Sequence, residues 1–307
     1  MQNVHLKANS HWMNDPNGFI YYKNKYHLFY QCFPYGPRWG RIHWAHAVSS
    51  DLVHWEYMGI SLFPSKPDDR DGCFSGSAIE QNGKMYLYYT GVRYLTEDPE
   101  DINLCLDDDF VSAQMVVTSE DGVRFDNIRD KKTVIPVFKN SEIADAKNTR
   151  DPKVWKEDDA LYMVVGSTDK GKQGKLLFFK SKDTENFTFV NSATKENFGW
   201  MWECPDYFEV DGAQVLLFSP MGFCKEEKAY ENQAICMQVN FNKENCAMVL
   251  PDKYQYIDWG LDLYAPQTAV DEAGRRVLFA WLRMPVAIDE KWCGMQCIPR
   301  VIEVKND

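Results

Sequence analysis

The chain has 307 residues and a formal net charge of −11 at pH 7. This charge excludes nucleic acid as an expected partner, because phosphate binding needs concentrated Lys and Arg and the sequence has no basic stripe. No apolar stretch approaches the roughly 18 residues that a membrane span needs, and the N-terminus shows no signal-peptide pattern. We therefore expect a cytoplasmic protein that binds neither nucleic acid nor membrane.

Nine cysteines are scattered along the chain, an odd number that favours free, buried thiols where no signal peptide is present. Cys293 and Cys297 have three residues between them and no accompanying His pair, so a zinc site is not expected. The acidic stretch from Glu97 to Asp109 predicts a solvated loop, or alternatively a border of a pocket mouth.

In chain order, a short polar motif is followed five times by an apolar run, a tight polar turn and a second apolar run. The heads of these five repeats are Asp15, Ser75, Asp151, Glu203 and Asp262. A period of roughly 50 residues or more is typical of a propeller. The repeats continue to residue 282 without a Pro/Gly/Ser-rich linker, so residues 1–307 are expected to form one domain.

Each repeat predicts antiparallel strands buried on both faces. Asn82-Gly83 and Asp211-Gly212 favour type I′ hairpin turns, and the second apolar run, as in residues 85–89, is almost continuously apolar. A Ser-x-Asp motif starting at Ser49, Ser119 and Ser181 predicts turns between outer strands. The pattern predicts an all-β fold, a five-bladed β-propeller with four-stranded antiparallel blades around a central funnel.

Innermost strands of a propeller converge on the axis, so Asp15, Asp151 and Glu203 are expected to meet in the funnel. Clustered carboxylates suggest glycoside hydrolysis, in which one carboxylate attacks or activates water and another protonates the leaving oxygen. Side chains suited to bind sugar hydroxyls are Asn14, Gln31, Arg150 and Asp262. Apolar faces for the sugar ring are offered by Trp12, Trp39, Phe74 and Trp281.

Each motif alone also has an ordinary structural interpretation. Asp-Pro-Asn-Gly and Arg-Asp-Pro are common turn sequences. Glu203 lies between Trp202 and Cys204-Pro205, an apolar setting that favours a protonated carboxyl group and suits a general acid. It could equally be a buried Glu with satisfied hydrogen bonds. The recurrence at equivalent blade positions favours the functional interpretation.

Four blocks of the sequence closely resemble the signature blocks of glycoside hydrolase family 32. They are Trp12 to Gly18, Phe74 to Ala78, Arg150 to Pro152, and Glu203-Cys204. The segments around Trp39 and Asp262 match too, so the resemblance covers nearly the whole chain.

The resemblance implies a retaining double displacement on a terminal β-fructofuranosyl group of a small fructoside such as sucrose, sucrose 6-phosphate or a short fructo-oligosaccharide. Asp15 would be the nucleophile, Glu203 the acid/base, and Asp151 the residue that binds fructose hydroxyls and stabilises the transition state. No metal or organic cofactor is implied. The fructose subsite would be lined by Asn14, Gln31, Trp39, Phe74, Ser75, Arg150 and Asp262.

Three alternatives stay open at this point: a fructosyltransferase, an inverting propeller glycosidase and a non-catalytic fructoside-binding propeller. Family members usually continue into a C-terminal β-sandwich, and this sequence stops at Asp307, shortly after the fifth hairpin; either the sequence is a truncated version or the sandwich was lost. We expect the propeller face where the sandwich would dock to expose an apolar patch. A homo-oligomer, or polar replacements on that face, would then cover or remove the patch.

Overall fold

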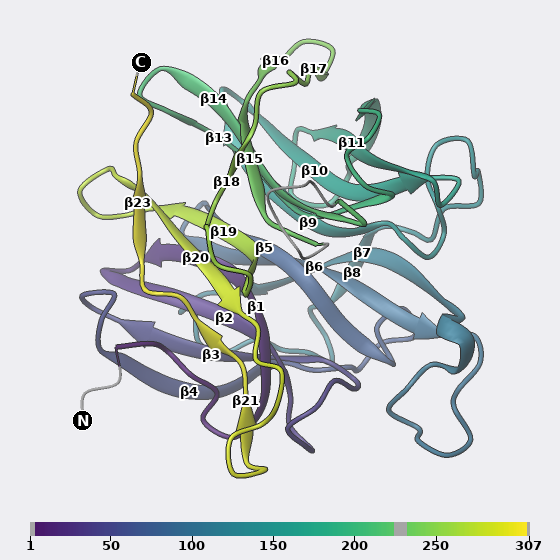
Figure 1. Cartoon of the computed structure of the whole chain (residues 1–307). Helices are drawn as coiled ribbons and strands as arrows, with labels where there is room; N and C mark the ends of the chain where they lie inside the picture. The colour runs from purple at the N-terminus through teal and green to yellow at the C-terminus, as the bar shows by residue number, and fades with distance from the viewer. Residues whose placement is uncertain (1–3, 224–231, 306–307) are drawn as a thin grey trace.

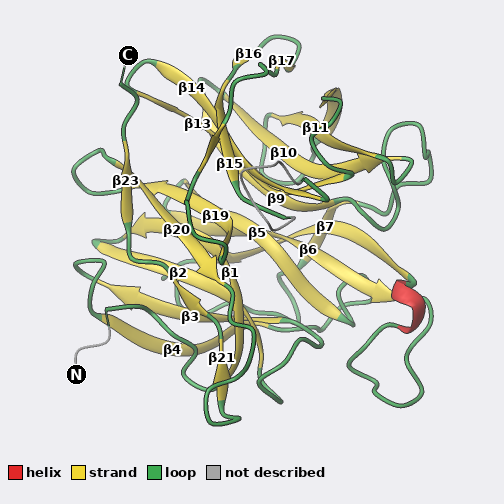
Figure 2. Ribbon diagram, in the orientation of Figure 1, coloured by secondary structure: helices red, strands yellow, loops and turns green. Residues whose placement is uncertain are grey.

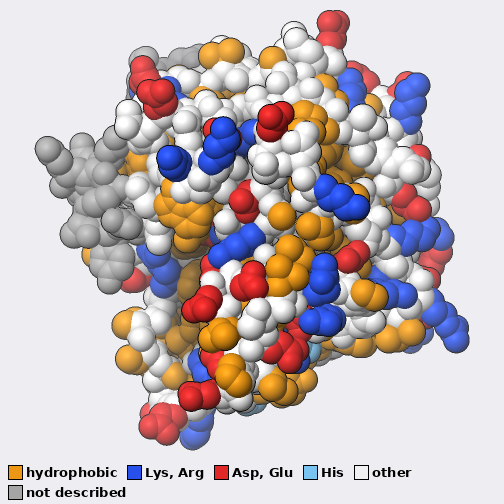
Figure 3. Space-filling model, turned by 90° about the vertical axis from the view of Figure 1, so that its right-hand side faces the viewer, with side chains coloured by type: hydrophobic (Ala, Val, Ile, Leu, Met, Phe, Trp, Pro, Cys, Tyr) orange, Lys and Arg blue, Asp and Glu red, His pale blue; other side chains and the backbone are white. Residues whose placement is uncertain are grey.

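The computed structural model describes residues 4–223 and 232–305. Strands dominate the chain, and one 3₁₀ turn, η1 (Leu106–Asp108), interrupts them (Figure 2). A search of the described residues finds no helix that is long and apolar enough to cross a membrane. Acidic, basic and apolar side chains are interspersed over the face that Figure 3 shows.

The chain forms a five-bladed β-propeller, as predicted, and the first three blades are regular antiparallel sheets in sequence order. Blade 1 contains β1 (His11–Tyr22), β2 (Lys25–Phe33), β3 (His43–Ser49) and β4 (Trp55–Leu62). Blade 2 contains β5 (Gly72–Gln81), β6 (Lys84–Tyr94), β7 (Phe110–Ser119) and β8 (Lys132–Ile135). Blade 3 contains β9 (Arg150–Glu157), β10 (Ala160–Asp169), β11 (Gln173–Ser181) and β12 (Thr188–Thr194).

The last two blades have shorter outer strands. Blade 4 contains β13 (Met201–Val210), β14 (Ala213–Met221), β15 (Ile235–Gln238) and β18 (Gln255–Tyr256), with a separate hairpin of β16 (Asn240–Asn242) and β17 (Ala247–Val249). Blade 5 contains β19 (Leu263–Val270) and β20 (Arg276–Leu282), and two short strands, β22 (Met295–Gln296) and β23 (Arg300–Ile302), both pair with β20.

The ring is closed by a strand from the C-terminal part of the chain. β21 (Trp292–Cys293) runs parallel to the start of β1 and gives blade 1 a fifth strand. Gln296 also donates from Nε2 to the main-chain oxygen of Asn14 at 2.7 Å. Residues 292–296, which follow β20, therefore hold the first strand of blade 1 in place.

The apolar core lies between the blades, with one cluster at each of the five junctions. At the junction of blades 3 and 4, for example, Val164 and Phe178 pack with Trp202 and Phe218. Comparable clusters join blades 2 and 3, 1 and 2, 4 and 5, and 1 and 5. Every sheet is thus covered on both faces, which explains why the second strand of each repeat reads as continuously apolar.

The predicted Ser-x-Asp turns join the third and fourth strands of blades 1, 2 and 3. Ser49 Oγ accepts from the Leu52 amide at 2.9 Å, and Asp51 Oδ1 accepts from the amides of Val53 and His54. The motif at Ser119 uses the same bonds, and at Ser181 the hydroxyl accepts from the Asp183 amide while Asp183 Oδ1 accepts from the next amides along the chain. This prediction is confirmed.

The first strands of the blades, β1, β5, β9, β13 and β19, surround the axis and contact one another in a closed ring. Most of them lie near the middle of the view in Figure 1, with β4 and β23 farther out. Hydrogen bonds cross between neighbours: Asn17 Oδ1 accepts from the Gly76 amide at 3.1 Å, and Ser77 Oγ donates to the Pro152 oxygen at 2.8 Å.

All five inner strands contain a β-bulge at the same level. The pairing skips Asn14-Asp15 in β1, Ser75 in β5, Asp151-Pro152 in β9, Cys204-Pro205 in β13 and Ala265-Pro266 in β19. Proline lacks an N–H and is tolerated in sheets at such irregular positions. Since a bulge bends the strand and redirects side chains, the X-Pro dipeptides mark where four of the five strands turn side chains toward the axis, and Ser75-Gly76 marks the place in β5. The interpretation of Asp-Pro as a simple turn is wrong.

Close packing at this level predicts a large cost for any added atom at Gly76. A Cβ there would lie 1.9 Å from the Tyr88 carbonyl oxygen, so Gly76→Ala should lower the unfolding free energy by more than about 3 kcal/mol. The control is Gly171→Ala, where φ is +67° but nothing lies within 4 Å, and about 1 kcal/mol is expected. Denaturant titration measures both; equal losses would contradict this packing argument.

Candidate active site

Asp15 lies at the bulge of β1, within a network of short hydrogen bonds. Its Oδ2 accepts from Ser75 Oγ at 2.5 Å, and its Oδ1 accepts from Asn14 Nδ2 at 3.2 Å. Asn14 Nδ2 also donates to Gln31 Oε1, and Gln31 Nε2 donates to Ser75 Oγ at 2.6 Å. Asn14, Gln31 and Ser75 are almost fully buried. This closed loop of donors fixes the orientation of the Asp15 carboxylate.

Glu203 projects from β13, and two donors bind its carboxylate. Arg150 donates to Oε1 at 2.8 Å from one terminal nitrogen and at 3.1 Å from Nε, and Tyr264 donates from its hydroxyl to Oε2 at 2.6 Å. The predicted apolar setting of Glu203 is therefore wrong. Trp202 is fully buried and bonds the Phe198 oxygen, because neighbouring residues of a strand point to opposite faces.

Asp151 and Cys204 connect the two carboxylates described above. Asp151 Oδ2 accepts from the Cys204 amide at 2.9 Å, and the Cys204 sulfur lies 3.7 Å from Asp151 Oδ2 and 3.6 Å from Asp15 Oδ2. Asp151 and Cys204 have φ values of 68° and 48°, which non-glycine residues rarely adopt. Such strain often gathers at functional sites. The three predicted carboxylates therefore share one site.

The carboxylates influence one another electrostatically. Burial raises the pKa of Asp15 to about 6; the Ser75 hydrogen bond opposes this rise, and the charge of Glu203 adds to it. Burial also raises the pKa of Asp151 to about 7, with Arg150 opposing and the charges of Glu203 and Asp15 adding. Burial keeps the pKa of the Tyr264 hydroxyl well above its usual value, so it remains a donor to Glu203.

Four aromatic rings form a continuous wall beside the carboxylates. Trp12 lies between Trp281 and Trp39, with ring centroids 5.8 and 6.5 Å apart, and Trp39 contacts Phe74 at 5.5 Å. Trp12 Nε1 donates to Asn14 Oδ1 at 2.8 Å, which ties the wall to the carboxylate network. All four predicted aromatic residues thus lie together, and Trp39 is the most exposed of them.

The acidic stretch borders this wall. Asp101 pairs with Arg38 at 2.5 Å and Glu97 pairs with Arg41 at 2.8 Å, on either side of Trp39. None of residues 97–109 is buried and most are exposed, as predicted for a solvated loop, and these two contacts also place the loop at the border of the wall.

Asp262 is the one predicted site residue that the structure does not bring to the carboxylates. It is exposed, it precedes β19, and its main-chain oxygen accepts from the Arg283 amide. Among the described residues, no hydrogen bond joins its side chain to Asp15, Asp151 or Glu203. Its role in binding fructose stays a prediction.

Sequence reasoning missed Tyr264, and also Asn148, which accepts from Arg150 at 3.1 Å. Tyr264 could have been found by aligning the repeats on their X-Pro dipeptides instead of on their acidic residues. That alignment places Tyr264, before Ala265-Pro266, level with Arg150, Glu203 and Asn14. Asp262 lies three residues before the dipeptide, which explains why it falls outside the network.

Below the carboxylates the channel is nearly filled. A cavity of about 10 Å³ lies among the four bulge prolines, Pro16, Pro152, Pro205 and Pro266, and it is about the size that one water needs. No group of three or more His, Cys, Asp or Glu in the described part of the chain is arranged to hold a metal ion.

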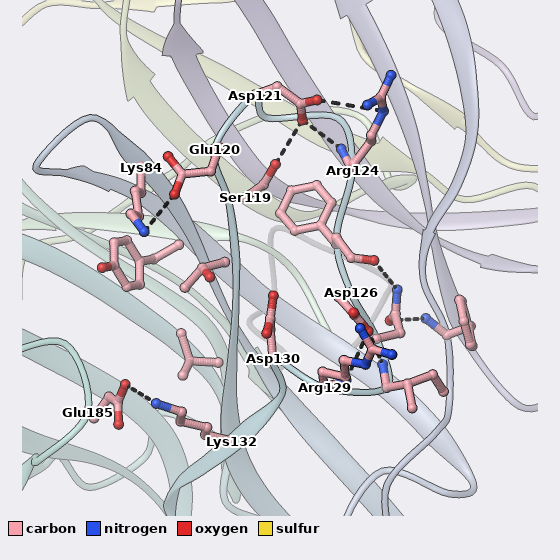
Figure 4. A pocket seen from close by; sticks show the side chains of 17 residues that line it. Lys84, Ser119, Glu120, Asp121, Arg124, Asp126, Arg129, Asp130, Lys132 and Glu185 are labelled. Carbon is pink, nitrogen blue, oxygen red and sulfur yellow. Dashed lines mark hydrogen bonds and ion pairs between the residues drawn. The ribbon is translucent and has the colours of Figure 1, made fainter.

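A larger pocket, of about 910 Å³, lies on the outer part of blade 2, away from the carboxylates. Both of its lysines are ion-paired, as Figure 4 shows: Lys84 with Glu120 at 2.6 Å and Lys132 with Glu185 at 2.5 Å. Because these lysines are already paired, they offer little free charge to a ligand. We therefore place the candidate active site in the funnel.

The sequence matches the model of the glycosyl hydrolases family 32 N-terminal domain over residues 5–307. The chain belongs to this family. It is 36% identical to a sucrose-6-phosphate hydrolase of Zymomonas mobilis over 98% of this chain and 59% of that protein. It is 35% identical to a raffinose invertase of Escherichia coli over 97% of this chain and 61% of that protein.

A solved structure with the same fold is a variant β-fructofuranosidase of Bombyx mori in complex with sucrose. The TM-score is 0.83, with 33% identity over 98% of this chain and 62% of that one. The chain therefore spans about three fifths of the length of the relatives it matches.

The raised pKa of Asp15 predicts a pH-dependent cost to stability. Above pH 3.8 the unfolded chain releases this proton before the folded chain does, so stability falls as pH rises until about pH 6. Asp15→Asn removes the cost and should raise the unfolding free energy at pH 7 by roughly 1 to 3 kcal/mol, since the group is partly exposed. Thermal unfolding at several pH values measures the difference, which should shrink toward pH 4. A difference independent of pH would contradict the raised pKa.

Proposed function

We propose that this chain is a retaining glycoside hydrolase that releases terminal β-fructofuranosyl groups. The observation that carries the proposal is the meeting of Asp15, Asp151 and Glu203 at the bulges of three inner strands, beside a wall of four aromatic rings. Membership of the family supports the same chemistry. The intact carboxylate network argues against a non-catalytic binding protein.

In the first step, Asp15 attacks the anomeric carbon of the fructosyl group while the leaving oxygen takes a proton from Glu203. At neutral pH an Asp15 carboxyl with a pKa of about 6 is mostly ionised, as a nucleophile must be. The hydrogen bonds from Ser75 and Asn14 hold the Asp15 carboxylate in a fixed orientation. In the second step Glu203 accepts a proton from a water molecule while the water oxygen attacks the anomeric carbon; the bond between that carbon and Asp15 breaks, which releases fructose and restores the Asp15 carboxylate and the protonated Glu203.

Asp151 is proposed to bind the fructose hydroxyls and to stabilise the transition state. Its Oδ2 is held by the Cys204 amide and its own amide donates to Thr90 Oγ1 at 2.9 Å, so its position is fixed from both sides. Asn14, Gln31, Ser75 and Arg150 complete the polar side of the subsite. The aromatic wall supplies the apolar side, against which a sugar ring can pack.

The substrates that we propose are small fructosides: sucrose, sucrose 6-phosphate or short fructo-oligosaccharides. The names of the relatives, a sucrose-6-phosphate hydrolase and a raffinose invertase, and the sucrose complex of the Bombyx mori enzyme support this class. A cytoplasmic location and a homo-oligomer stay predictions.

Glu203→Gln tests the acid/base role. The amide cannot give up a proton, so hydrolysis of sucrose should fall by about 100-fold or more, while a fructoside with an activated leaving group should lose far less in its first step. Tyr264→Phe is the matched control: it removes one hydrogen bond to Glu203 but leaves the carboxyl group, and a smaller loss on both substrates is expected. Steady-state rates on both substrates measure these losses. Equal losses of activity on the two substrates for Glu203→Gln would contradict the acid/base role of Glu203.

Asp15→Asn tests the nucleophile. The variant should fold and still bind substrate but lose activity by several orders of magnitude, and no fructosyl-enzyme should be trapped when the reaction is quenched. Mass spectrometry of the quenched protein and the anomeric configuration of the first product decide the matter. Inverted product from the wild-type enzyme, or near-normal turnover by the variant, would remove Asp15 from this role.

A further inference from the structure

A second cavity lies at the other end of the axis, which we call the far mouth. It measures about 470 Å³ and is lined by the C-terminal parts of all five inner strands: residues 19–21, 78–79, 153–157, 207–209 and 268–270. These residues follow the bulges in every strand, so the nearly filled level of the prolines separates the far mouth from the carboxylates. Its volume falls within the roughly 300 to 1,000 Å³ of small-molecule sites.

Two cations and one carboxylate lie close together at the inner end of the far mouth. Lys153 Nζ is 3.0 Å from Asp206 Oδ2 and donates to the Thr268 oxygen at 2.8 Å. Asp206 Oδ2 also accepts from the Thr268 amide at 2.6 Å. Arg276 lines the same cavity, so a single largely buried carboxylate faces two cations. The three groups together carry a net charge of +1 (two cations and one carboxylate), and burying unbalanced charge is costly.

Arg276 is poorly satisfied by its neighbours. Its guanidinium carbon lies 4.7 Å from the centre of the Phe208 ring, and one terminal nitrogen donates to Thr268 Oγ1 at 3.5 Å. Its Nε is buried without a hydrogen-bond partner, and no ion pair among residues 4–223 and 232–305 involves it. Burial lowers the pKa of Arg276, and the charge of Asp206 opposes this only in part. An arginine offers five donors, so several remain for a ligand.

Of the two glutamates near the rim, one is ion-paired with a lysine outside the cavity and the other, Glu209, keeps its negative charge. Glu157 pairs with Lys243, and Glu209 accepts from Gln214 Nε2 at 3.2 Å. Lys156 is exposed on the rim, and within the described ranges it forms no ion pair. The far mouth thus holds two cations, Arg276 and Lys156, that form no ion pair within the described ranges, whereas Lys84 and Lys132 in the pocket of blade 2 are both paired (Figure 4).

From this arrangement we propose that the far mouth binds a small molecule bearing an oxyanion, a phosphate or a carboxylate group, through Arg276 and Lys156. The planar fork of an arginine matches such a group in two parallel hydrogen bonds, and the stacked Phe208 ring holds the fork in place. The rest of the molecule occupies the cavity between the inner strands. The site is independent of the proposed sugar chemistry, since none of its residues belongs to the carboxylate network.

Calorimetric titration at constant ionic strength tests the site, with inorganic phosphate, fructose 6-phosphate and citrate as separate ligands. Arg276→Gln and Lys156→Glu should each weaken binding of the active ligand by about tenfold or more. Lys156 is exposed, so its replacement cannot fail merely by unfolding the chain. Lys172→Glu is the matched control: it makes the same charge change at an exposed turn residue outside the cavity and should bind like the wild type.

Binding of phosphate and fructose 6-phosphate alone would identify a phosphate site, and binding of citrate alone a carboxylate site; either supports the proposal if both variants weaken it. Equal affinities in the wild type and in both far-mouth variants would overturn it, because the anion would then bind elsewhere, such as the funnel. Failure of all three anions to bind the wild type would overturn it too. Neither result bears on hydrolysis, which is measured separately.

Discussion

The shared level of bulges in the inner strands is the constraint on which the rest of this molecule depends. Five strands from distant parts of the chain must approach one axis, where there is little room for side chains. The bulges widen the ring locally and direct polar residues inward. The prolines at four of them give up an N–H that the interrupted ladder would leave unpaired. Hydrogen bonds between neighbouring inner strands then fix the blades relative to one another.

This arrangement concentrates acidic groups where desolvation disfavours charge. Asp15 and Asp151 both have raised pKa values for that reason, and the Arg150 guanidinium lies beside Glu203 as the main compensating charge. A stable protein without a catalytic task would place fewer carboxylates there. The strained backbone at Asp151 and Cys204 adds to the same cost. The site is therefore a local weakness that the apolar clusters between the blades offset.

Much of this structure could be predicted from the sequence because the repeats are local. Each hairpin can be recognised from its turn residues and its apolar second strand. Once the sequence is divided into five blades, Asp15, Asp151 and Glu203 are predicted to lie together at the axis. Residues set by long-range register could not be predicted in the same way. The pairing of β21 with β1 rests on two residues, and the contact of Tyr264 with Glu203 depends on the bulge of β19. Asp262 was predicted to lie at the site because the repeats were aligned on their acidic residues instead of on their X-Pro dipeptides.

The level of the four bulge prolines also decides how molecules can travel through the propeller. A cavity of about 10 Å³ is too small for a sugar, so the far mouth and the carboxylate end are not joined by a tunnel along the axis. A substrate or product in the funnel must leave through the opening by which it entered. A long sugar chain could therefore present only its tip, and the enzyme that we propose would have to let go after each cleavage instead of sliding along a polymer.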